Sequence, residues 1–447
     1  MSAPDRQPLV LAIDFGTSWC KAAYVTPDGS ILAIGRVWTR GLPSRGGADG
    51  LDELWQALVS SVQDANARLT AAAISARPDA VGIACRGMFG VVLNKHREPL
   101  PLTSLLPSSK GSPITRAVYA SPAWLPEGGY AYSYAPRLVG SLRWLRDNEP
   151  DNWPRVRFAG ALHDWLVLQL SGIWVTDLAT GPGQDDWPQA MVELTGLPLD
   201  TFPVIRNGHA LAGTLTTMTA QALDLPAGTP VITGYHDGGA ASIGTGTISA
   251  GDTCLTLGSN LAFRPVSSAR LPDCFGYPIT RDAWAWVDSV AGSAARLDDV
   301  AATLSGTSHA TPEQHQKLAA LGLRVPAGSP GDEPGAIYRA TVEAIALDVR
   351  RLMDRAIENG ARPTRLVATG GATDNPLMLN VLSAILGMPI EIGPPEAGIL
   401  GTAIGAAVAS GWLPSIGAGV ATMVQTAPGV EPDPEDVAAY EMVRDTL

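Results

Sequence analysis

The sequence predicts an α/β fold in two domains, and three observations support this prediction. The N-terminal part reads as three short strands, a long helix and then further strands, an order typical of an α/β domain. An apolar strand that ends at Gly followed by a hydroxyl residue occurs at 11–18 and again at 254–259, so the second half repeats the form of the first. The length of 447 residues is enough for two or three domains.

The first half is expected to open with a β-meander. Apolar runs separated by a Gly-Thr-Ser turn and a Thr-Pro-Asp-Gly turn predict strands at 8–15, 19–25 and 30–38. A long helix is predicted at 49–73, because apolar side chains recur there at helical spacing and Asp49 lies near its start. The other elements predicted in this half are strands at 80–84, 91–93 and 173–176, and helices at 137–147, 160–170, 189–195 and 219–223.

The second half is predicted to contain four strands and three helices. They are strands at 252–257, 261–265, 365–368 and 391–392, and helices at 343–359, 376–386 and 396–410. Residues 397–424 carry no charge and are long enough to span a bilayer. Several Gly residues and Pro414 interrupt this run, so a tightly packed helix followed by a turn at 411–414 is favoured over a membrane span.

The composition limits the classes of partner and the cellular compartment. A net charge of −12 argues against a nucleic acid bound on a large basic face. The four cysteines form no CxxC pair, so neither a zinc ribbon nor a disulfide framework is predicted; they are Cys20, Cys85, Cys254 and Cys274. Because residues 1–8 lack the build of a secretory signal, a cytoplasmic location with reduced thiols is expected.

One carboxylate, Asp237, stands in the middle of the chain at the end of a short β-branched run. The stretch Val231–Gly246 then continues with small residues, which let backbones approach each other closely. A carboxylate at a strand end, flanked by backbone N–H groups, is well placed to act as a general base. The alternative is that Asp237 is only a helix N-cap, and the stretch by itself leaves both open.

Four Gly-rich turns follow predicted strands, at 14–18, 237–239, 257–259 and 369–372. Each offers backbone N–H groups, most with hydroxyl donors, in a concave turn, an arrangement that binds phosphate oxygens. Any one of them is also compatible with an ordinary turn, but four in succession, two with an adjacent carboxylate, indicate a phosphate-binding protein. The chain has no GxxxxGK[ST] motif and no GxGxxG after its first strand, which argues against a P-loop enzyme and a Rossmann dinucleotide site.

The order of these motifs resembles the FGGY family of carbohydrate kinases, within the actin, Hsp70 and sugar-kinase superfamily. The matching segments are Ile13–Ser18 for the first phosphate motif, Gly82–Phe89 for sugar contacts, Gly234–Gly246 for the catalytic Asp, Leu255–Ser259 for the second phosphate motif, Gly370–Asn380 for the adenosine motif and Leu400–Ala403 for the closing helix. The resemblance implies two ribonuclease H-like (actin-like ATPase) domains, at 1–247 and 248–447, with a cleft between them.

The resemblance also implies the reaction and its residues. Asp237 would accept the proton of a sugar or polyol hydroxyl that attacks the γ-phosphate of ATP, and Asp14 would help to hold Mg²⁺. Nucleotide contacts would come from Gly16, Thr17, Ser18, Gly258, Ser259, Gly370, Gly371, Ala372 and Asn375, and substrate contacts from Arg86, Gly87, Met88 and Phe89. A pentulose such as xylulose is the favoured substrate, and a homodimer is common in the family.

The sequence departs from the family pattern in three places. The Trp-x-Asp-x-Arg sugar motif is replaced at 102–110 by a stretch without Trp or Asp, Thr369 stands where the adenosine motif has another Gly, and 292–333 is short. These departures keep a second hypothesis open, a nucleotide- or sugar-binding regulator that has lost catalysis. An actin-like ATPase that works by conformational change is a third, and Arg86 is alternatively a structural or surface residue.

Overall fold

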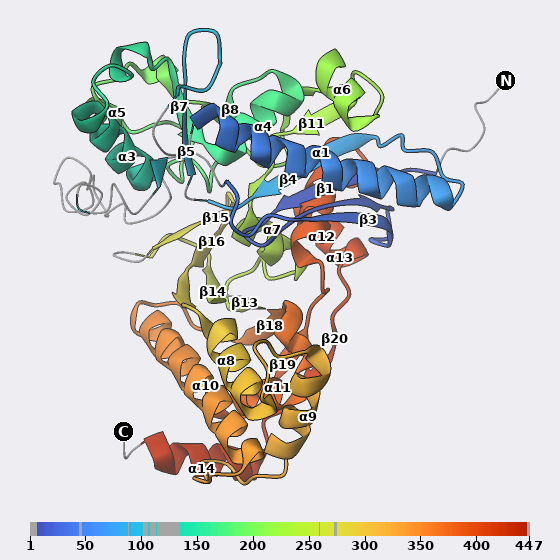
Figure 1. The fold of residues 1–447 in the computed structure, drawn as a ribbon, viewed down its shortest axis with the longest axis vertical. Helices are drawn as coiled ribbons and strands as arrows, with labels where there is room; N and C mark the ends of the chain where they lie inside the picture. Colours follow the sequence, from blue (N-terminus) through green and yellow to red (C-terminus); the bar gives the residue numbers. More distant parts are fainter. Residues whose placement is uncertain are drawn as a thin grey trace. The chain divides into compact units, whose positions relative to one another are not determined.

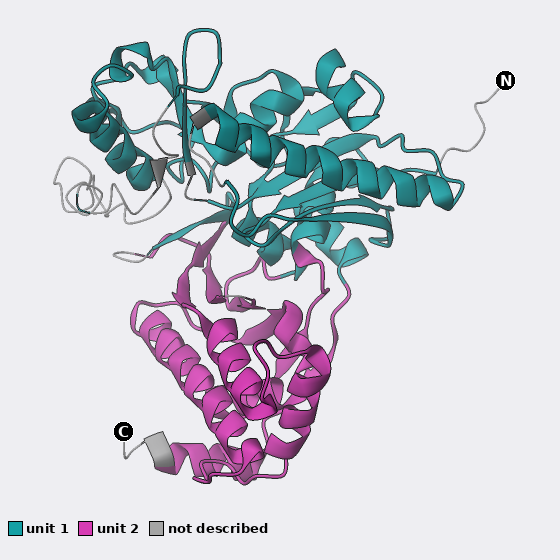
Figure 2. Ribbon diagram, in the orientation of Figure 1, with its two compact units in different colours: residues 1–246, 275–281, 398–424 teal, residues 247–274, 282–397, 425–447 magenta. Residues whose placement is uncertain are grey.

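The computed structural model describes residues 7–43, 47–87, 89–101, 106–107, 113, 135–258, 260–271 and 275–444. The chain divides into two compact units (Figure 2). Unit 1 comprises 1–246, 275–281 and 398–424, and unit 2 comprises 247–274, 282–397 and 425–447. The sequence prediction assigned all of 248–447 to the second domain, whereas two of its segments pack into unit 1.

The sheet of unit 1 begins with the predicted antiparallel meander (Figure 1). In spatial order its strands are β10 (Leu211–Thr214), β11 (Pro230–Ile232), β4 (Ala80–Cys85), β1 (Val10–Phe15), β2 (Trp19–Val25) and β3 (Ile31–Trp38), and β12 (Tyr235–His236) also pairs with β4. β4 lies parallel to β1, and β11 and β12 lie parallel to β4. The C-terminal ends of β1, β4 and β12 therefore meet at one edge of the sheet.

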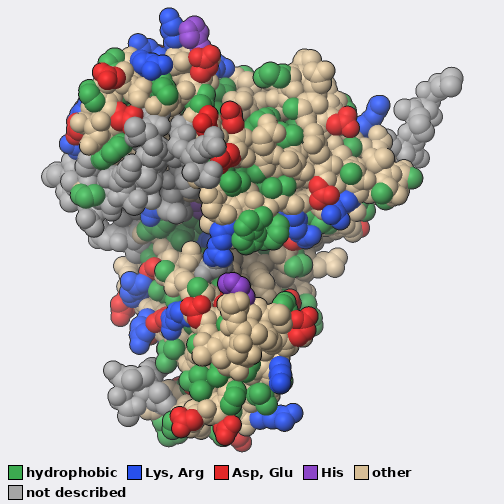
Figure 3. Space-filling view, viewed as in Figure 1, with side chains coloured by type: hydrophobic (Ala, Val, Ile, Leu, Met, Phe, Trp, Pro, Cys, Tyr) green, Lys and Arg blue, Asp and Glu red, His purple; other side chains and the backbone are tan. Residues whose placement is uncertain are grey.

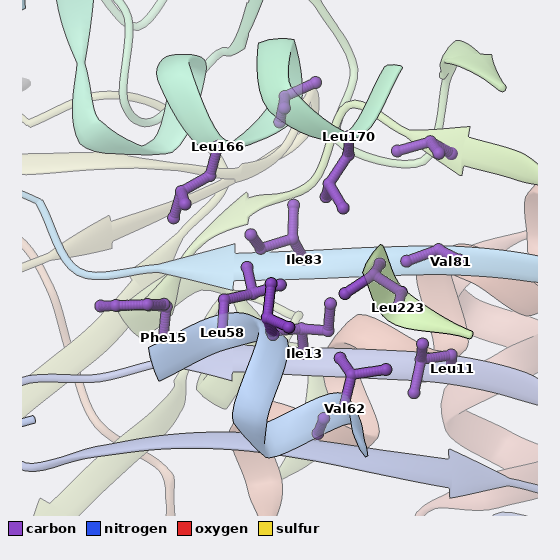
Figure 4. Packing of buried hydrophobic residues seen from close by; sticks show 14 of the residues in the cluster. Leu11, Ile13, Phe15, Leu58, Val62, Val81, Ile83, Leu166, Leu170 and Leu223 are labelled. Carbon is purple, nitrogen blue, oxygen red and sulfur yellow. The ribbon is translucent and has the colours of Figure 1, made fainter. Parts of the chain in front are cut away.

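A hydrophobic core lies between one face of this sheet and three helices (Figure 4). The helices are α1 (Gly47–Ala71), α4 (Leu162–Ser171) and α6 (Thr217–Leu223). Alternate residues of β1 point into this core, among them Ile13 and Phe15, and meet Leu58 of α1 and Leu166 of α4. Because side chains alternate along a strand, the residue between them, Asp14, points to the opposite face.

The opposite face of the sheet is covered by α12 (Ala397–Ala409), and α7 (Asp237–Gly244) and α13 (Ile416–Met423) belong to the same unit. α12 approaches the surrounding backbone very closely through its glycines. A Cβ on Gly401 would lie 1.9 Å from the Ala240 carbonyl oxygen, and one on Gly405 would lie 2.5 Å from the Tyr235 ring. This packing explains why 398–424 belongs to unit 1, and it is the tight helix that the small residues predicted.

The uncharged run at 397–424 is long enough to span a bilayer, so its structure matters for whether the chain crosses a membrane. Searching the described residues finds no helix of sufficient length and apolar character to cross a bilayer. The uncharged run instead forms α12, a turn and α13, and the turn was predicted while α13 was not.

The segment 275–281 contains β15 (Gly276–Thr280) and also packs into unit 1. The ring of Tyr277 contacts the ring of His236 in a tilted arrangement, with centroids 4.7 Å apart and an interplanar angle of 52°. Arg281 forms two hydrogen bonds with the Asp185 carboxylate, of 2.6 and 2.7 Å. The two contacts join residues 41 and 96 positions apart, so no local sequence pattern could reveal them.

Unit 2 repeats the strand order of unit 1. Its strands in spatial order are β16 (Ala283–Trp286), β14 (Leu261–Ser267), β13 (Asp252–Leu257), β18 (Arg365–Thr369), β19 (Ile390–Ile392) and β20 (Ala427–Val430), with β17 (Asp288–Val290) also paired to β14. β13 and β14 are antiparallel, β18 and β19 continue in parallel from β13, and β20 closes antiparallel. β13 thus corresponds to β1, as the repeated form at 254–259 predicted, and β18 corresponds to β4, which was not predicted.

Five helices accompany this sheet: α8 (Ser293–Ser305), α9 (Pro312–Gly322), α10 (Pro334–Glu358), α11 (Pro376–Leu386) and α14 (Pro434–Arg444). α10 packs against α8, α9 and α11. The sequence predicted α11 with its bounds, and it predicted only the C-terminal part of α10. It missed α8, α9, α14, β20 and the strands β15 to β17.

The remaining elements of unit 1 are β5 (Phe89–Leu93), β6 (Leu106–Pro107), α3 (Ala135–Asn148), β7 (Phe158–Ala161), β8 (Val175–Asp177), α5 (Gln189–Thr195) and β9 (Val204–Arg206). The helix expected at 160–170 begins at Leu162 because Gly160 and Ala161 pair with β5. The Asp164 carboxylate then accepts the N–H of Ala161 at 2.7 Å and fixes the start of α4.

Candidate functional site

The two carboxylates predicted to carry the chemistry lie at the same edge of the unit 1 sheet. Asp14 of β1 pairs with Ala84 of β4, and Tyr235 of β12 pairs with the same Ala84 from the other side. β1 and β12 are therefore two strand spacings apart, roughly 10 Å between backbones. Asp237 follows β12 directly, so Asp14 and Asp237 flank the end of β4.

Asp237 is the first residue of α7, and the N-cap of that helix is His236. The alternative that Asp237 serves only as an N-cap is therefore wrong. Its Oδ1 accepts the N–H of Gly238 at 2.7 Å and lies 3.1 Å from Nε2 of His236. The side chain is 35% exposed. The carboxylate is thus fixed through one oxygen and remains open to solvent.

His236 is buried and holds Asp237 in place. Its Nδ1 accepts the N–H of Gly238 at 3.2 Å, so the ring proton belongs on Nε2, which donates to Oδ1 of Asp237. The backbone N–H of His236 donates to the buried carboxylate of Asp177 at 3.4 Å. Asp177 also accepts the N–H groups two and three residues further along the chain. The sequence did not assign either residue a role.

The turn between β1 and β2 holds Gly16, Thr17 and Ser18 beside Asp14. The N–H of Gly16 donates to the carbonyl of Trp19, and the N–H of Thr39 donates to that of Ser18, both at 2.9 Å. Thr17 is exposed. The turn is therefore a tight loop at the same sheet edge as the two carboxylates, and its phosphate-binding role stays a prediction.

Arg86 is buried beneath this turn. Its guanidinium donates to the carbonyl oxygens of Gly16, Thr17 and Leu42, at 3.4, 3.1 and 3.1 Å, and lies over the ring of Phe15. Burial lowers the pKa of Arg86, and the nearby negative charge of Asp237 opposes this shift. These contacts favour the structural alternative for Arg86, because its donors hold two loops together.

The structure describes only some of the other residues that were predicted to contact the substrate. Gly87 follows Arg86 at the same sheet edge, and Phe89 begins β5, although its side chain is outside the description. Met88 and most of the altered stretch at 102–110 fall outside the described residues. Contact of these residues with a substrate stays a prediction.

Asp14 lies against the first turn of α12. A Cβ on Gly398 would come within 2.6 Å of Oδ2 of Asp14, so a larger residue there would displace the Asp14 carboxylate. The N-terminal end of a helix carries partial positive charge, which stabilises a carboxylate beside it. The described residues contain no group of three or more His, Cys, Asp or Glu side chains that could hold a metal. A single carboxylate nevertheless fits Mg²⁺, which keeps several waters and uses substrate phosphates as ligands.

In unit 2 a cavity of about 500 Å³ opens at the C-terminal ends of β13 and β18. Four predicted nucleotide contacts line it together: Gly258, Gly371, Ala372 and Asn375. Their clustering follows from the register of β13 and β18, in which Thr256 pairs with Thr369, so the two Gly-rich loops leave the sheet side by side. Ser259, another predicted nucleotide contact, lies outside the described residues.

Gly370 lies behind this cavity and is not part of its lining. Its φ of +103° is accessible to Gly and strained for other residues, and a Cβ would lie 2.7 Å from the Leu257 carbonyl oxygen. Gly370 therefore permits the close approach of the two loops, and its contact with a nucleotide stays a prediction.

The lining of the cavity is mainly apolar, with a few polar groups. Its charged lining residues are the carboxylates Asp298 and Asp374, and none of the lining residues is Lys or Arg. Such a cavity suits an uncharged, partly apolar group with hydrogen-bond donors, as a nucleoside is, better than a phosphate.

Sequence reasoning missed the polar wall of the cavity, formed by Asp298 and His315 with Tyr338 behind them. The segment that carries the first two had no predicted helix. One signal was available: Thr311 and Gln314 form a capping box with Pro at the first helical position, which marks the start of α9. The contacts among Asp298, His315 and Tyr338 depend on how three helices pack, and no local sequence pattern indicates them.

Comparison with known proteins gives matches over nearly the whole chain. Residues 9–244 match the N-terminal domain, and residues 299–410 the C-terminal domain, of the FGGY family of carbohydrate kinases. The chain is 23% identical to the autoinducer-2 kinase of Salmonella typhimurium, with 98% of this chain and 92% of the relative covered.

Solved structures give the same picture for the fold. The xylulose kinase of Rhodospirillum rubrum superposes with a TM-score of 0.83 at 20% identity, covering 98% of this chain and 97% of that one. The gluconate kinase of Lactobacillus acidophilus superposes with a TM-score of 0.84 at 16% identity, covering 98% and 96%. These likenesses confirm the predicted α/β class and the actin-like ATPase fold.

Proposed function

Because the chain belongs to the FGGY family of carbohydrate kinases, and is therefore an ATP-dependent sugar kinase, we propose that Asp237 is its general base. The observation that carries this proposal is the geometry of Asp237, a partly exposed carboxylate fixed through Oδ1 at the sheet edge it shares with Asp14. In this proposal Oδ2 accepts the proton of the substrate hydroxyl as that hydroxyl attacks the γ-phosphate of ATP.

The other residues bind and orient the reactants. The turn at 16–18 and Gly258 supply N–H and hydroxyl donors to the phosphates, where stabilisation comes from positioning and electrostatics. Asp14 would hold Mg²⁺, which when bound neutralises charge on the phosphate oxygens. The cavity in unit 2 takes the adenosine part of ATP, since its lining is apolar and free of cationic side chains.

The substrate is proposed to be a small sugar or polyol, with a pentulose such as xylulose favoured. The relatives described above are kinases named for autoinducer-2, xylulose and gluconate, so family membership leaves the sugar open. We extend the proposal to a cytoplasmic protein that has no nucleic-acid or membrane partner and forms a homodimer. The net charge of −12 supports the absence of a nucleic-acid partner, as does the mixture of acidic and basic side chains on the described surface in Figure 3.

A coupled ADP-release assay with Mg-ATP over a panel of ketoses, aldoses, sugar acids and polyols tests the function. One substrate class is expected to stimulate ADP release well above the rate without sugar. If none does, while calorimetry detects binding of ATP and of a sugar, the alternative of a catalytically altered regulator replaces the kinase proposal.

Substitution of His236 tests how the base is held. His236→Ala is expected to lower kcat about tenfold to a hundredfold with little change in the sugar KM, because a hydrogen bond to a charged group contributes about 1.5–3 kcal/mol. His236→Gln, which keeps an N–H donor, is expected to recover part of the loss. Equal kcat values for the wild type and His236→Ala would show that Asp237 does not need this contact.

A further inference from the structure

A continuous hydrogen-bond chain runs along the polar wall of the unit 2 cavity. The amide nitrogen of Asn375 donates to the hydroxyl of Tyr338 at 3.0 Å, and this hydroxyl lies 2.9 Å from Nδ1 of His315. Nε2 of His315 lies 2.9 Å from Oδ1 of Asp298. The four residues come from the start of α11, from α10, from α9 and from α8, which are neighbouring helices in Figure 1.

The directions of the hydrogen bonds at the two ends of this hydrogen-bond chain are determined. Oδ1 of Asn375 accepts the N–H of Met378 and caps α11, so the NH₂ group must face Tyr338. The Tyr338 hydroxyl accepts this NH₂ group and lies within hydrogen-bond distance of Nδ1 of His315, and burial raises the pKa of this hydroxyl to about 12. At the other end, Nε2 of His315 donates a proton to the Asp298 carboxylate, because a carboxylate can only accept.

This arrangement fixes what Asn375 presents to a ligand. One N–H of its amide and one lone pair of its Oδ1 are taken by Tyr338 and Met378, which leaves one donor and one acceptor for the cavity. Adenine offers the complementary pair, an amino donor beside a ring-nitrogen acceptor, whereas the corresponding edge of guanine offers two acceptors.

We propose that Tyr338 and His315 are positioning residues that orient the Asn375 amide and thereby set the preference of this kinase for adenine over guanine nucleotides. The inference rests on the proposed placement of adenosine in this cavity. Asp298 completes the chain by fixing the tautomer of His315. Tyr338 acts through Asn375, because its side chain is fully buried and is not among the residues that line the cavity.

Calorimetric titration of the full-length protein with Mg-ADP and Mg-GDP tests this role without any sugar. Tyr338→Phe removes only the hydroxyl, and it is expected to weaken ADP binding by about five- to tenfold, the effect of one hydrogen bond, while GDP binding changes little. The ratio of ADP to GDP affinity is therefore expected to fall. A loss of stability alone would weaken both nucleotides equally and leave this ratio unchanged.

Two further variants complete the test. His315→Ala removes the next member of the hydrogen-bond chain, a side chain that is partly exposed. This variant is also expected to lower the ratio of ADP to GDP affinity. His309→Ala changes an exposed histidine between α8 and α9 that does not line the cavity. This variant is expected to leave the ratio of ADP to GDP affinity unchanged.

An unchanged ADP to GDP ratio in both Tyr338→Phe and His315→Ala overturns the proposal, as does a wild type that binds neither nucleotide. Because the readout is binding, it separates this inference from the proposed sugar phosphorylation. A protein that prefers ADP through Tyr338 but phosphorylates no sugar keeps the inference and loses the function.

Discussion

Asp237→Asn is expected to reduce kcat for sugar phosphorylation by about a thousandfold, because removal of a general base typically costs a factor of 10² to 10⁴. The amide has nearly the shape of the carboxylate, and its oxygen can keep the contacts that Oδ1 makes with Gly238 and His236. Nucleotide affinity is expected to stay within about twofold of the wild type, since the proposed adenosine cavity lies in unit 2. Steady-state ADP release and ADP titration on the same preparation measure the two quantities.

The matched control for this variant is Asp151→Asn, which changes an exposed Asp in a turn of the same unit and away from the sheet edge. Its kcat is expected to equal that of the wild type. If Asp237→Asn retained more than about a tenth of the wild-type kcat, another group would have to accept the proton, and the base assignment would be withdrawn.

Gly401→Ala is expected to destabilise the protein by about 3 kcal/mol or more, at the upper end of the cost of overpacking. The added Cβ would lie 1.9 Å from the carbonyl oxygen of Ala240 and 2.9 Å from the backbone nitrogen of Gly244, both in α7. Neither partner is a side chain that can rotate away, so one of the two helices must shift. Because α7 begins at Asp237, a shift is expected to lower kcat as well.

Urea unfolding monitored by circular dichroism measures this loss, with Gly417→Ala as the control. Gly417 lies exposed on α13 and a Cβ there meets no atom closer than 3.9 Å. Because Gly417 is exposed in the first turn of α13, the stability of this variant is expected to stay within about 0.5 kcal/mol of the wild type. A Gly401→Ala protein as stable as the wild type would contradict the close packing of α12 against α7.

Most of the regular elements near the site could be predicted because they depend on local patterns. The meander at the N-terminus, α1 and α11 follow from strand alternation, helical spacing and turn residues within a few positions of one another. The Gly-rich turns could be placed at strand ends for the same reason. Elements without a clear period, such as α8, α9 and the strands at 276–290, were missed.

The sequence by itself determined the fold class, the repeated strand-turn form at 11–18 and 254–259, and the position of Asp14 near the end of one strand and of Asp237 after another, because local spacing encodes these features. Only the tertiary structure decided that 398–424 packs into unit 1, that Arg86 holds two loops, and that His236 fixes Asp237. Only the tertiary structure showed that one hydrogen-bond chain joins Asp298, His315, Tyr338 and Asn375. The physical reason is that a contact depends on which surfaces the fold brings together, and residues far apart in the sequence carry no local sign of that partner.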